Sequence, residues 1–353
     1  MIKGVDIFCG AGGMSLGAQM AGIDVTLAID YNQSAIETFK FNHPETPNIL
    51  CENIANVDFK NYNDNYFVLM GGPPCQGFSV SNTKTRNETN SNNSLFYEFI
   101  RAVEKLQPRW FIFENVEGIT LFQKGNVIKT LKEEMIKLGY VTTENVLTAS
   151  DYGVPQKRNR FFMVGNRAGL DFVFPPKLNF QVSVEEAISD LPDIENGSSI
   201  NELPYKKTKD SSYTKLMRKN SSKSLQNIVS KNKDYVIERY KHIQQGENWK
   251  SIPPELMSNY KDINNCHSGI YRRLKADKPS VVIANYRKNM LIHPFQDRGL
   301  SVREAARLQS FPDDFIFQGS LMHKQQQIGN AVPPLLAKAI VEQIIKIDNK
   351  YLK

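Results

Sequence analysis

The 353-residue sequence contains only four cysteines and two tryptophans, and it has no long hydrophobic run. The cysteines are far apart and form no CxxC pair, so neither a zinc site nor a disulfide scaffold is expected. No apolar stretch approaches the roughly 20 residues that a membrane helix needs, and residues 1–6 lack the features of a signal peptide. We therefore expect a cytoplasmic protein that contacts no membrane and binds no metal.

Acidic residues are outnumbered in one part of the chain only. The net charge is +7, and residues 201–250 carry ten lysines and two arginines against five acidic residues, so this segment accounts for the whole excess. A local basic block in an otherwise balanced chain is typical of proteins that bind a polyanion. A solvated lysine-rich surface is the alternative, and the charge taken alone favours it.

The first half of the chain alternates between short apolar runs and stretches with helical spacing. The apolar runs are residues 5–8, 25–29, 67–70, 110–113 and 160–165. This alternation predicts an α/β fold with a doubly wound, mostly parallel sheet. Residues 190–265 are rich in Ser, Asn and Lys and show no clear period, which indicates a second, smaller domain. Regular structure resumes at Ser301, which can cap a helix together with Glu304.

Polar or glycine-rich residues follow the first two apolar runs. Residues 6–13 read DIFCGAGG, and Asp30 ends the second run, 20 residues after Gly10. Open α/β sheets bind ligands at the carboxyl ends of their strands, where a carboxylate is suited to hold ribose hydroxyls. Ser15 stands where the dinucleotide fingerprint requires its third glycine. The pattern predicts a nucleoside-containing cofactor of another kind, with a purely structural turn as the alternative.

The segment GGPPCQGFS at residues 71–79 surrounds Cys75 with prolines and glycines. A structural cysteine has no need of such surroundings, whereas an activated thiolate is a potent nucleophile. Glu114 ends the next apolar run, and a carboxyl buried there can be protonated near neutral pH and donate a hydrogen bond. Arg158 and Arg160, two positions apart, would point to one face of an extended strand.

Taken together, these blocks resemble the bacterial type of the DNA (cytosine-5) methyltransferase family. The matching segments stand in family order, and only about residues 175–265 lack a match; the segments are residues 6–13, 71–79, 114–116, 156–160, 301–312 and 327–333. The resemblance implies a Rossmann-like catalytic domain that binds S-adenosylmethionine, at residues 1–175 plus 325–353. It implies a target-recognition domain at residues 176–324.

The resemblance also implies a reaction. A methyl group passes from S-adenosylmethionine to C5 of a cytosine that is flipped out of a specific sequence in double-stranded DNA. Cys75 would form a covalent bond to C6, and Glu114 would hold N3 and the exocyclic amine. Arg158 and Arg160 would hold the O2 edge and nearby backbone. Residues 76–93 would form a loop that closes over the DNA, with Gln76 and Ser79 in contact with it.

Further residues are carried over from the family for the cofactor and for DNA. The cofactor residues are Phe8, Gly10, Gly12 and Gly13 at the methionine part, Asp30 at the ribose, Tyr31, Asn53 and Ile54 at the adenine, and Pro74, Leu95, Asn330 and Ala331 around the pocket. Asn53 stands where the family usually has aspartate, and core positions are the alternative for Phe8 and Leu95. The expected DNA contacts are Lys206, Lys207 and Lys209 at phosphates and Arg272 and Arg273 at base edges.

Two alternatives stay open. One is a tRNA cytosine-5 methyltransferase of the same family, although that branch usually departs from PPCQGFS after the cysteine, and this chain does not. The other is a catalytically inactive DNA-binding regulator, against which the intact Cys75, Glu114, Arg158 and Arg160 argue. We expect a monomer of prokaryotic or phage origin that belongs to a restriction–modification system or acts alone.

Overall fold

The computed structural model describes residues 2–62, 64–74, 94–208, 210–219, 221–260, 269–288 and 290–351. The chain forms two compact units, which are described separately. Unit 1 comprises Met1–Tyr152, Asn159–Leu178 and Val332–Lys353, and unit 2 comprises Gly153–Arg158 and Asn179–Ala331. Compared with the expected domains, residues 153–158 and 325–331 group with unit 2. The hydrogen bond from Lys157 N to Ser280 O, 2.9 Å long, is one of the contacts that hold the first of these segments there.

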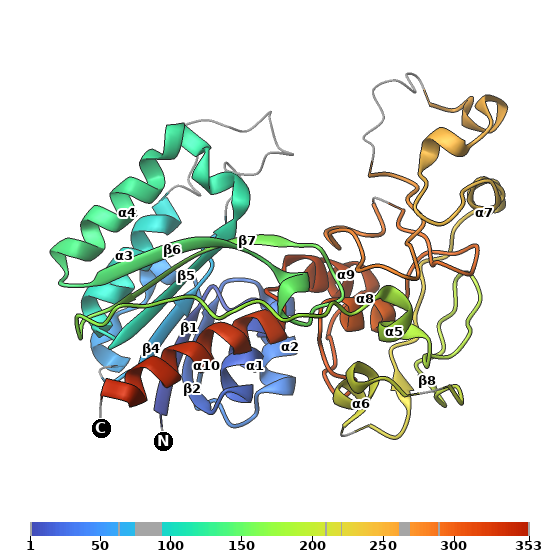
Figure 1. Cartoon of the computed structure of the whole chain (residues 1–353). Coiled ribbons are helices and arrows are strands. Elements are labelled where there is room, and N and C mark those ends of the chain that lie inside the picture. Colours follow the sequence, from blue (N-terminus) through green and yellow to red (C-terminus); the bar gives the residue numbers. More distant parts are fainter. Residues whose placement is uncertain are drawn as a thin grey trace. The chain divides into compact units, whose positions relative to one another are not determined.

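Unit 1 is built on a seven-stranded sheet with the order β3-β2-β1-β4-β5-β7-β6 (Figure 1). The first five strands in this order are parallel, whereas β7 is antiparallel to both β5 and β6. The prediction of a doubly wound, mostly parallel sheet is therefore confirmed. The strands are β1 (Ile2–Ile7), β2 (Ile23–Asp30), β3 (Asn48–Cys51), β4 (Val68–Gly71), β5 (Trp110–Val116), β6 (Val141–Thr148) and β7 (Asn159–Asn166).

Helices cover both faces of this sheet. In the described part of unit 1 the α-helices are α1 (Gly13–Met20), α2 (Gln33–Asn42), α3 (Ser94–Leu106), α4 (Asn126–Lys137) and α10 (Pro334–Tyr351). Short 3₁₀ helices follow several strands, namely η1 (Ile54–Asn56), η2 (Phe59–Tyr62), η4 (Glu117–Thr120), η5 (Phe122–Gly125) and η6 (Ala149–Tyr152). The apolar residues of α3 and α4 pack with those of the central strands into one core, in which Phe99 contacts the rings of Phe111 and Phe113 edge to face.

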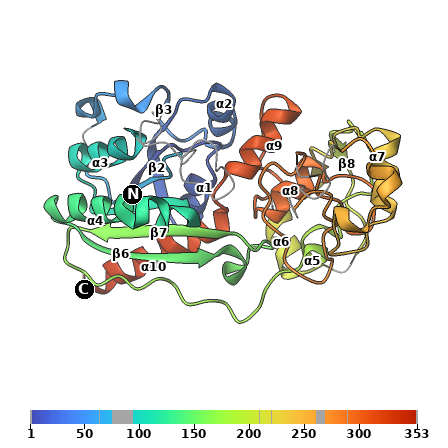
Figure 2. The same cartoon turned by 90° about the horizontal axis from the view of Figure 1, so that it is seen from above.

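The C-terminal helix α10 belongs to unit 1 because it packs closely against α1. A Cβ atom at Gly17 of α1 would lie only 2.4 Å from the carbonyl oxygen of Pro334, so the two helices approach at backbone distance. At the other end of α10, the buried Asp348 accepts hydrogen bonds from Arg109 Nε at 2.6 Å and from Trp110 Nε1 at 2.9 Å. In Figure 2, which views the cartoon from above, α10 runs along the sheet.

Unit 2 consists mainly of short helices and loops. Its elements are α5 (Val184–Ile188), α6 (Ser212–Arg218), α7 (Asp234–Lys241), α8 (Val302–Leu308), α9 (Leu321–Asn330), the 3₁₀ helices η7 (Trp249–Ser251) and η8 (Pro254–Met257), and a two-stranded antiparallel sheet of β8 (Glu202–Leu203) and β9 (Ser224–Leu225).

The predicted capping box begins α8. Ser301 Oγ accepts from the backbone N–H of Glu304 at 3.1 Å, and Glu304 Oε2 accepts from that of Ser301 at 2.7 Å. Burial by itself raises the pKa of Glu304, but the paired guanidinium of Arg298, together with His293 and the backbone N–H of Ser301, outweighs it and holds that pKa at about 2. Arg307 of the same helix binds the buried carboxylates of Asp190 and Asp313. Unit 2 therefore has a charged, fully paired centre around α8.

Candidate active site

The carboxyl ends of the parallel strands bring several predicted site residues to one edge of the sheet in unit 1. Ile7 at the end of β1 pairs with Ile29 of β2 and with Gly71 at the end of β4. Asp30 at the end of β2 pairs with Cys51 at the end of β3. The predicted residues at positions 8–13, 30–31, 53–54 and 72–74 therefore leave the sheet at neighbouring points along this edge (Figure 1).

The glycine turn is tied to the second strand through Asp30. The carboxylate of Asp30 accepts from the backbone N–H of Gly10 at 2.8 Å and from that of Asn32 at 2.8 Å. Burial raises the pKa of Asp30, and these backbone hydrogen bonds oppose the rise. A Cβ atom built at Gly10 would meet nothing within 4 Å, so the space beside the turn is open. The turn and the carboxylate therefore lie beside open space, where no side chain blocks a ligand.

The other predicted cofactor residues of unit 1 differ in their exposure. Tyr31 is 66% exposed, so its ring is available for stacking. Ile54 is buried, and Asn53 caps η1 because its Oδ1 accepts from Ala55 N at 3.1 Å. The side-chain oxygen of Asn53 thus already has one donor, and one further lone pair of that oxygen could receive an adenine amine. The others are Phe8 and Leu95, which are partly buried against the core, and Pro74, which is partly buried.

Glu114 lies at the end of β5, directly over the backbone of Gly72. A Cβ atom at Gly72 would come within 2.6 Å of Glu114 Oε2, so this position accepts no side chain without displacing the carboxyl. Oε1 of Glu114 lies 2.9 Å from Nε of Arg160 in β7, and both side chains are largely buried. The pair is possible because Arg160 lies opposite Val116 on the neighbouring antiparallel strand.

Asn115, next to Glu114, holds the chain that leads to Cys75. Its side-chain Nδ2 donates to the carbonyl oxygen of Pro73 at 3.2 Å, and Asn115 is buried. Asn115 was not among the predicted site residues, although the sequence does place it beside Glu114. Cys75 and the predicted loop of residues 76–93, which includes Gln76 and Ser79, lie outside the described residues.

Arg158 has a different environment from Arg160. It belongs to unit 2, where it is 1% exposed and donates to the carbonyl oxygens of Ile283, at 3.1 Å, and Gly329, at 2.8 Å. The prediction that Arg158 and Arg160 share one face of a strand is wrong, because β7 begins at Asn159 and Arg158 precedes it. These contacts make Arg158 a support for the backbone before Asn330.

Asn330 and Ala331 end unit 2. Asn330 is the last residue of α9, and its Oδ1 accepts from Gln326 Nε2 at 2.7 Å. The N–H of Ala331 donates to the carbonyl of Gln327 at 3.1 Å. A Cβ atom at Gly329 would lie 2.2 Å from the carbonyl oxygen of Ala284, so the chain before Asn330 packs tightly within unit 2.

The predicted DNA contacts of unit 2 divide into exposed and buried residues. Lys207 is exposed, Arg272 is partly exposed, and Lys206 forms an ion pair with Asp193 at 3.0 Å near the surface. Lys209 lies outside the described residues.

The environment of Arg273 contradicts the prediction that it contacts a base edge. It is 7% exposed, and its guanidinium donates to five acceptors within unit 2: the backbone carbonyls of Tyr240, Ile243, His293 and Gln296 and the carboxylate of Asp297. Five acceptors match the five N–H donors of a guanidinium, so Arg273 has none left for a base. It joins loops of unit 2 instead.

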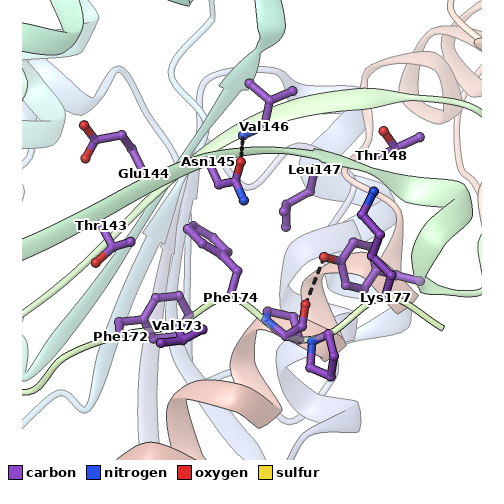
Figure 3. Close-up of a pocket in the computed structure, with 13 residues that line it drawn as sticks. Thr143, Glu144, Asn145, Val146, Leu147, Thr148, Phe172, Val173, Phe174 and Lys177 are labelled. Carbon is purple, nitrogen blue, oxygen red and sulfur yellow. Dashed lines mark hydrogen bonds between the residues drawn. The ribbon is translucent and has the colours of Figure 1, made fainter.

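A cavity of about 580 Å³ lies along the edge strand β6 of unit 1. Figure 3 shows its lining, which includes Asn145, Leu147 and Phe174. Within the lining, the hydroxyl of Tyr152 donates to the carbonyl of Pro175 at 3.1 Å. None of the predicted site residues lines it. Among the described residues, no group of three or more His, Cys, Asp or Glu side chains could hold a metal ion, and no helix is long and apolar enough to cross a membrane.

Comparisons with known proteins identify the family of the chain. The family model for C-5 cytosine-specific DNA methylase matches residues 2–346. The type II methyltransferase M.DdeI of Desulfomicrobium norvegicum is 35% identical over 96% of this chain and 88% of its own. The type II methyltransferase M1.HphI of Haemophilus parahaemolyticus is 33% identical over 98% and 87%. A crystal structure described as a DNA modification methyltransferase encoded within an E. coli prophage superposes with a TM-score of 0.82, at 28% identity over 99% of this chain and 100% of that one.

Proposed function

Because the chain belongs to the C-5 cytosine-specific DNA methylase family, we propose that it methylates C5 of one cytosine within a specific sequence of double-stranded DNA, as a monomer, through a covalent bond from Cys75 to C6. The observation that carries this proposal is the position of Glu114, whose carboxyl lies over Gly72 and is paired with Arg160 at 2.9 Å. This places an acid over Gly72, which precedes Cys75 by three residues, and the acid is largely buried.

S-adenosylmethionine is the methyl donor of this family, and when bound it supplies the methyl group. The residues that would hold it are the turn at Gly10 and Gly12, the carboxylate of Asp30, and the exposed ring of Tyr31. The open space beside Gly10 supports this assignment, since a side chain there would occupy it. Asp30 would bind the ribose hydroxyls, because its oxygens are fixed by the backbone N–H groups of Gly10 and Asn32.

Glu114 and Arg160 would act on the cytosine ring. A base inside a duplex is stacked, so the enzyme must extrude it to bring C5 and C6 within reach. The thiolate of Cys75 adds to C6, and a proton held by Glu114 at N3 neutralises the charge that develops on the ring. C5 then takes the methyl group, loses its proton to a base, and the bond from Cys75 to C6 breaks. Arg160 would hold Glu114 and the O2 edge.

Unit 2 would supply the contacts to DNA. The exposed Lys207, with Lys206 and Lys209, would bind phosphates, and Arg272 would approach the bases. Phosphate contacts of this kind fix the register of a protein on the duplex without reading its sequence. The relatives named above are bacterial, which supports a prokaryotic or phage origin.

Methyl transfer from labelled S-adenosylmethionine to bacterial genomic DNA, a DNA duplex library and tRNA tests the proposal. We expect label in duplex DNA only, at C5 of one cytosine in one sequence context. Cys75→Ser should abolish transfer and leave the protein folded. Transfer to tRNA alone would establish the RNA alternative, and no transfer by wild-type protein that binds DNA would establish the inactive regulator.

A further inference from the structure

Asp6 is a buried carboxyl in β1 to which the proposed function gives no role. Its side chain is 0% exposed, and β1 lies between β2 and β4 in the centre of the sheet. Burying a carboxyl costs free energy unless hydrogen bonds compensate. One oxygen of this carboxyl, Oδ1, has no hydrogen-bond partner among the described residues. An apolar residue would therefore suit the fold better at this position.

The partner of Asp6 is Ser15 in the first turn of α1. The hydroxyl of Ser15 donates to Oδ2 of Asp6 over 2.6 Å, and the backbone of Ser15 interacts with the same carboxyl. Gly12 is the N-cap residue of α1, so Ser15 is the third residue of the helix. An N-cap side chain normally accepts from the backbone N–H at the second or third position. Asp6 instead accepts from the side-chain hydroxyl at the third position, and in this way it holds the first turn of α1 from the neighbouring strand.

Gly12 itself leaves α1 without a side-chain cap. Its φ is +94°, and a Cβ atom there would lie 2.4 Å from Nε2 of His43, so no capping residue fits at this position. The turn before α1 is also the proposed cofactor site, which requires a backbone free of side chains. A cap supplied by Asp6 meets both requirements, since its carboxyl reaches the helix from the strand and not from the turn.

We propose that Asp6 is a positioning residue for the cofactor: through Ser15 it fixes the N-terminus of α1 and thereby the glycine turn that receives S-adenosylmethionine. This inference rests on the proposed location of the cofactor at the turn. The opposite side of α1 is already fixed by its close packing against α10 at Gly17. The contact between Asp6 and Ser15 therefore sets the end of the helix that faces the ligand.

The charge on Asp6 makes this role measurable. Burial raises the pKa of Asp6 to about 7, the hydrogen bonds from Ser15 oppose the rise, and the charge of Asp30 adds to it. The titratable groups that interact with Asp6 are Asp30 and the thiol of Cys9, and neither brings a positive charge. The residues paired with it on β2 and β4, Ala28 and Met70, are apolar.

Two effects of pH with opposite signs follow. The folded state binds the Asp6 proton more tightly than the unfolded chain does, because the pKa of this carboxyl is 3.8 in the unfolded chain. The contribution of Asp6 to stability therefore falls as the pH rises from about 4 to about 7 and stays low above that. The ionised carboxylate, however, accepts from Ser15 more strongly than the neutral acid does. Cofactor affinity should accordingly rise over the range in which Asp6 ionises.

The test is calorimetric titration of the full-length protein with S-adenosylhomocysteine at pH 6, 7 and 8. This ligand lacks the sulfonium charge but keeps an α-ammonium group, so the comparison with Asp6→Asn identifies the part of any pH effect that comes from Asp6. We expect affinity to rise by up to about tenfold, since the ionised fraction of a group that titrates near pH 7 rises from about one tenth to nine tenths. Asp6→Asn should bind more weakly at pH 8, with a flat profile, and should not melt at a lower temperature there.

Ser15→Ala provides an independent arm of the test. It removes the hydroxyl that favours the ionised form, so the midpoint of the affinity profile should move to higher pH. Val5→Ala, a truncation of a fully buried neighbour in β1, is the matched control: it should lower the melting temperature and leave the pH profile unchanged.

Unchanged affinity and an unchanged profile in Asp6→Asn would overturn the inference. So would a flat profile in the wild-type protein. Asp30→Asn and Tyr31→Ala separate this failure from that of the proposed cofactor site. If these two variants bind weakly while Asp6→Asn binds normally, only the role of Asp6 is wrong. If they bind as the wild type does, the cofactor lies elsewhere and the proposed site is wrong.

Discussion

The carboxyl of Glu114 occupies the space that a side chain at residue 72 would need, because Glu114 Oε2 lies 2.6 Å from the Cβ position of Gly72. Gly72 directly follows β4, and Glu114 lies near the end of β5, the adjacent parallel strand. The absence of a side chain at one strand end therefore determines where the carboxyl at the next strand end can lie.

Gly72→Ala should impair activity far more than folding. The atom that the new methyl group meets is the end of a flexible side chain, so Glu114 can rotate away at a cost of about 1 kcal/mol. Its ion pair with Arg160 would then be disturbed. A misplacement of about 1 Å at a reacting group can lower the rate about 10²-fold. Single-turnover methylation and thermal melting measure the two effects.

Gly299→Ala is the control for that substitution. A Cβ atom at Gly299 meets its nearest neighbour, the carbonyl oxygen of Leu291, at 3.8 Å, which is an ordinary contact. The variant should keep both its melting temperature and its rate. Equal activity of Gly72→Ala and the wild type would show that the position of Glu114 is not critical.

Glu114→Gln should retain DNA binding and lower the methylation rate by at least about 10²-fold, the scale of one lost acid or charge-stabilising donor. Glutamine can donate to N3 from its amide, but it cannot supply a proton. Glu117→Gln is the control, since Glu117 lies on the adjacent turn and accepts from Asn159 Nδ2 at 3.0 Å. A rate within a few-fold of the wild type would contradict the catalytic role of Glu114.

Replacing Lys206, Lys207 and Lys209 by alanine should weaken binding to all DNA sequences about equally. Each phosphate contact that is lost should reduce the slope of log K against log salt by roughly 0.9. The methylated sequence should stay the same, because phosphates carry no sequence information. Filter binding across salt concentrations and methylation mapping provide the readouts, with Lys129 and Lys137 of α4 replaced as the control pair. An unchanged slope would mean that the three lysines are only a solvated surface.

Arg273→Ala should destabilise the protein by about 3 kcal/mol or more, since removing one partner of a buried charged network leaves its acceptors unpaired. Arg272→Ala, one position earlier, should keep the melting temperature and change affinity for DNA. Thermal melting of both variants checks this contrast. If Arg273→Ala melted like the wild type and methylated DNA with relaxed sequence specificity, Arg273 would contact a base, as the sequence predicts.

The sequence alone predicted the mostly parallel sheet and five of its seven strands. Buried strands read as continuous apolar runs, and the glycine turn and Asp30 are recognisable because strand ends and their side-chain types are local properties. The two edge strands, β3 and β6, were not predicted. The sequence of β6, VTTENVLT, is mostly polar because one side of an edge strand faces water, so it lacks the apolar run that marks the inner strands.

Only the tertiary structure decided what the arginines and Asp6 do. Arg158, Arg160 and Arg273 look alike in sequence, yet Arg160 pairs with Glu114, while Arg158 and Arg273 donate to backbone carbonyls of distant segments. A guanidinium on a long side chain reaches partners in many directions, and its partners here lie up to 171 residues away. Asp6 stands within an apolar run, and its contact with the first turn of α1 is visible only in the folded structure. From sequence, a residue that fixes the start of a helix is expected directly before that helix and not in a neighbouring strand.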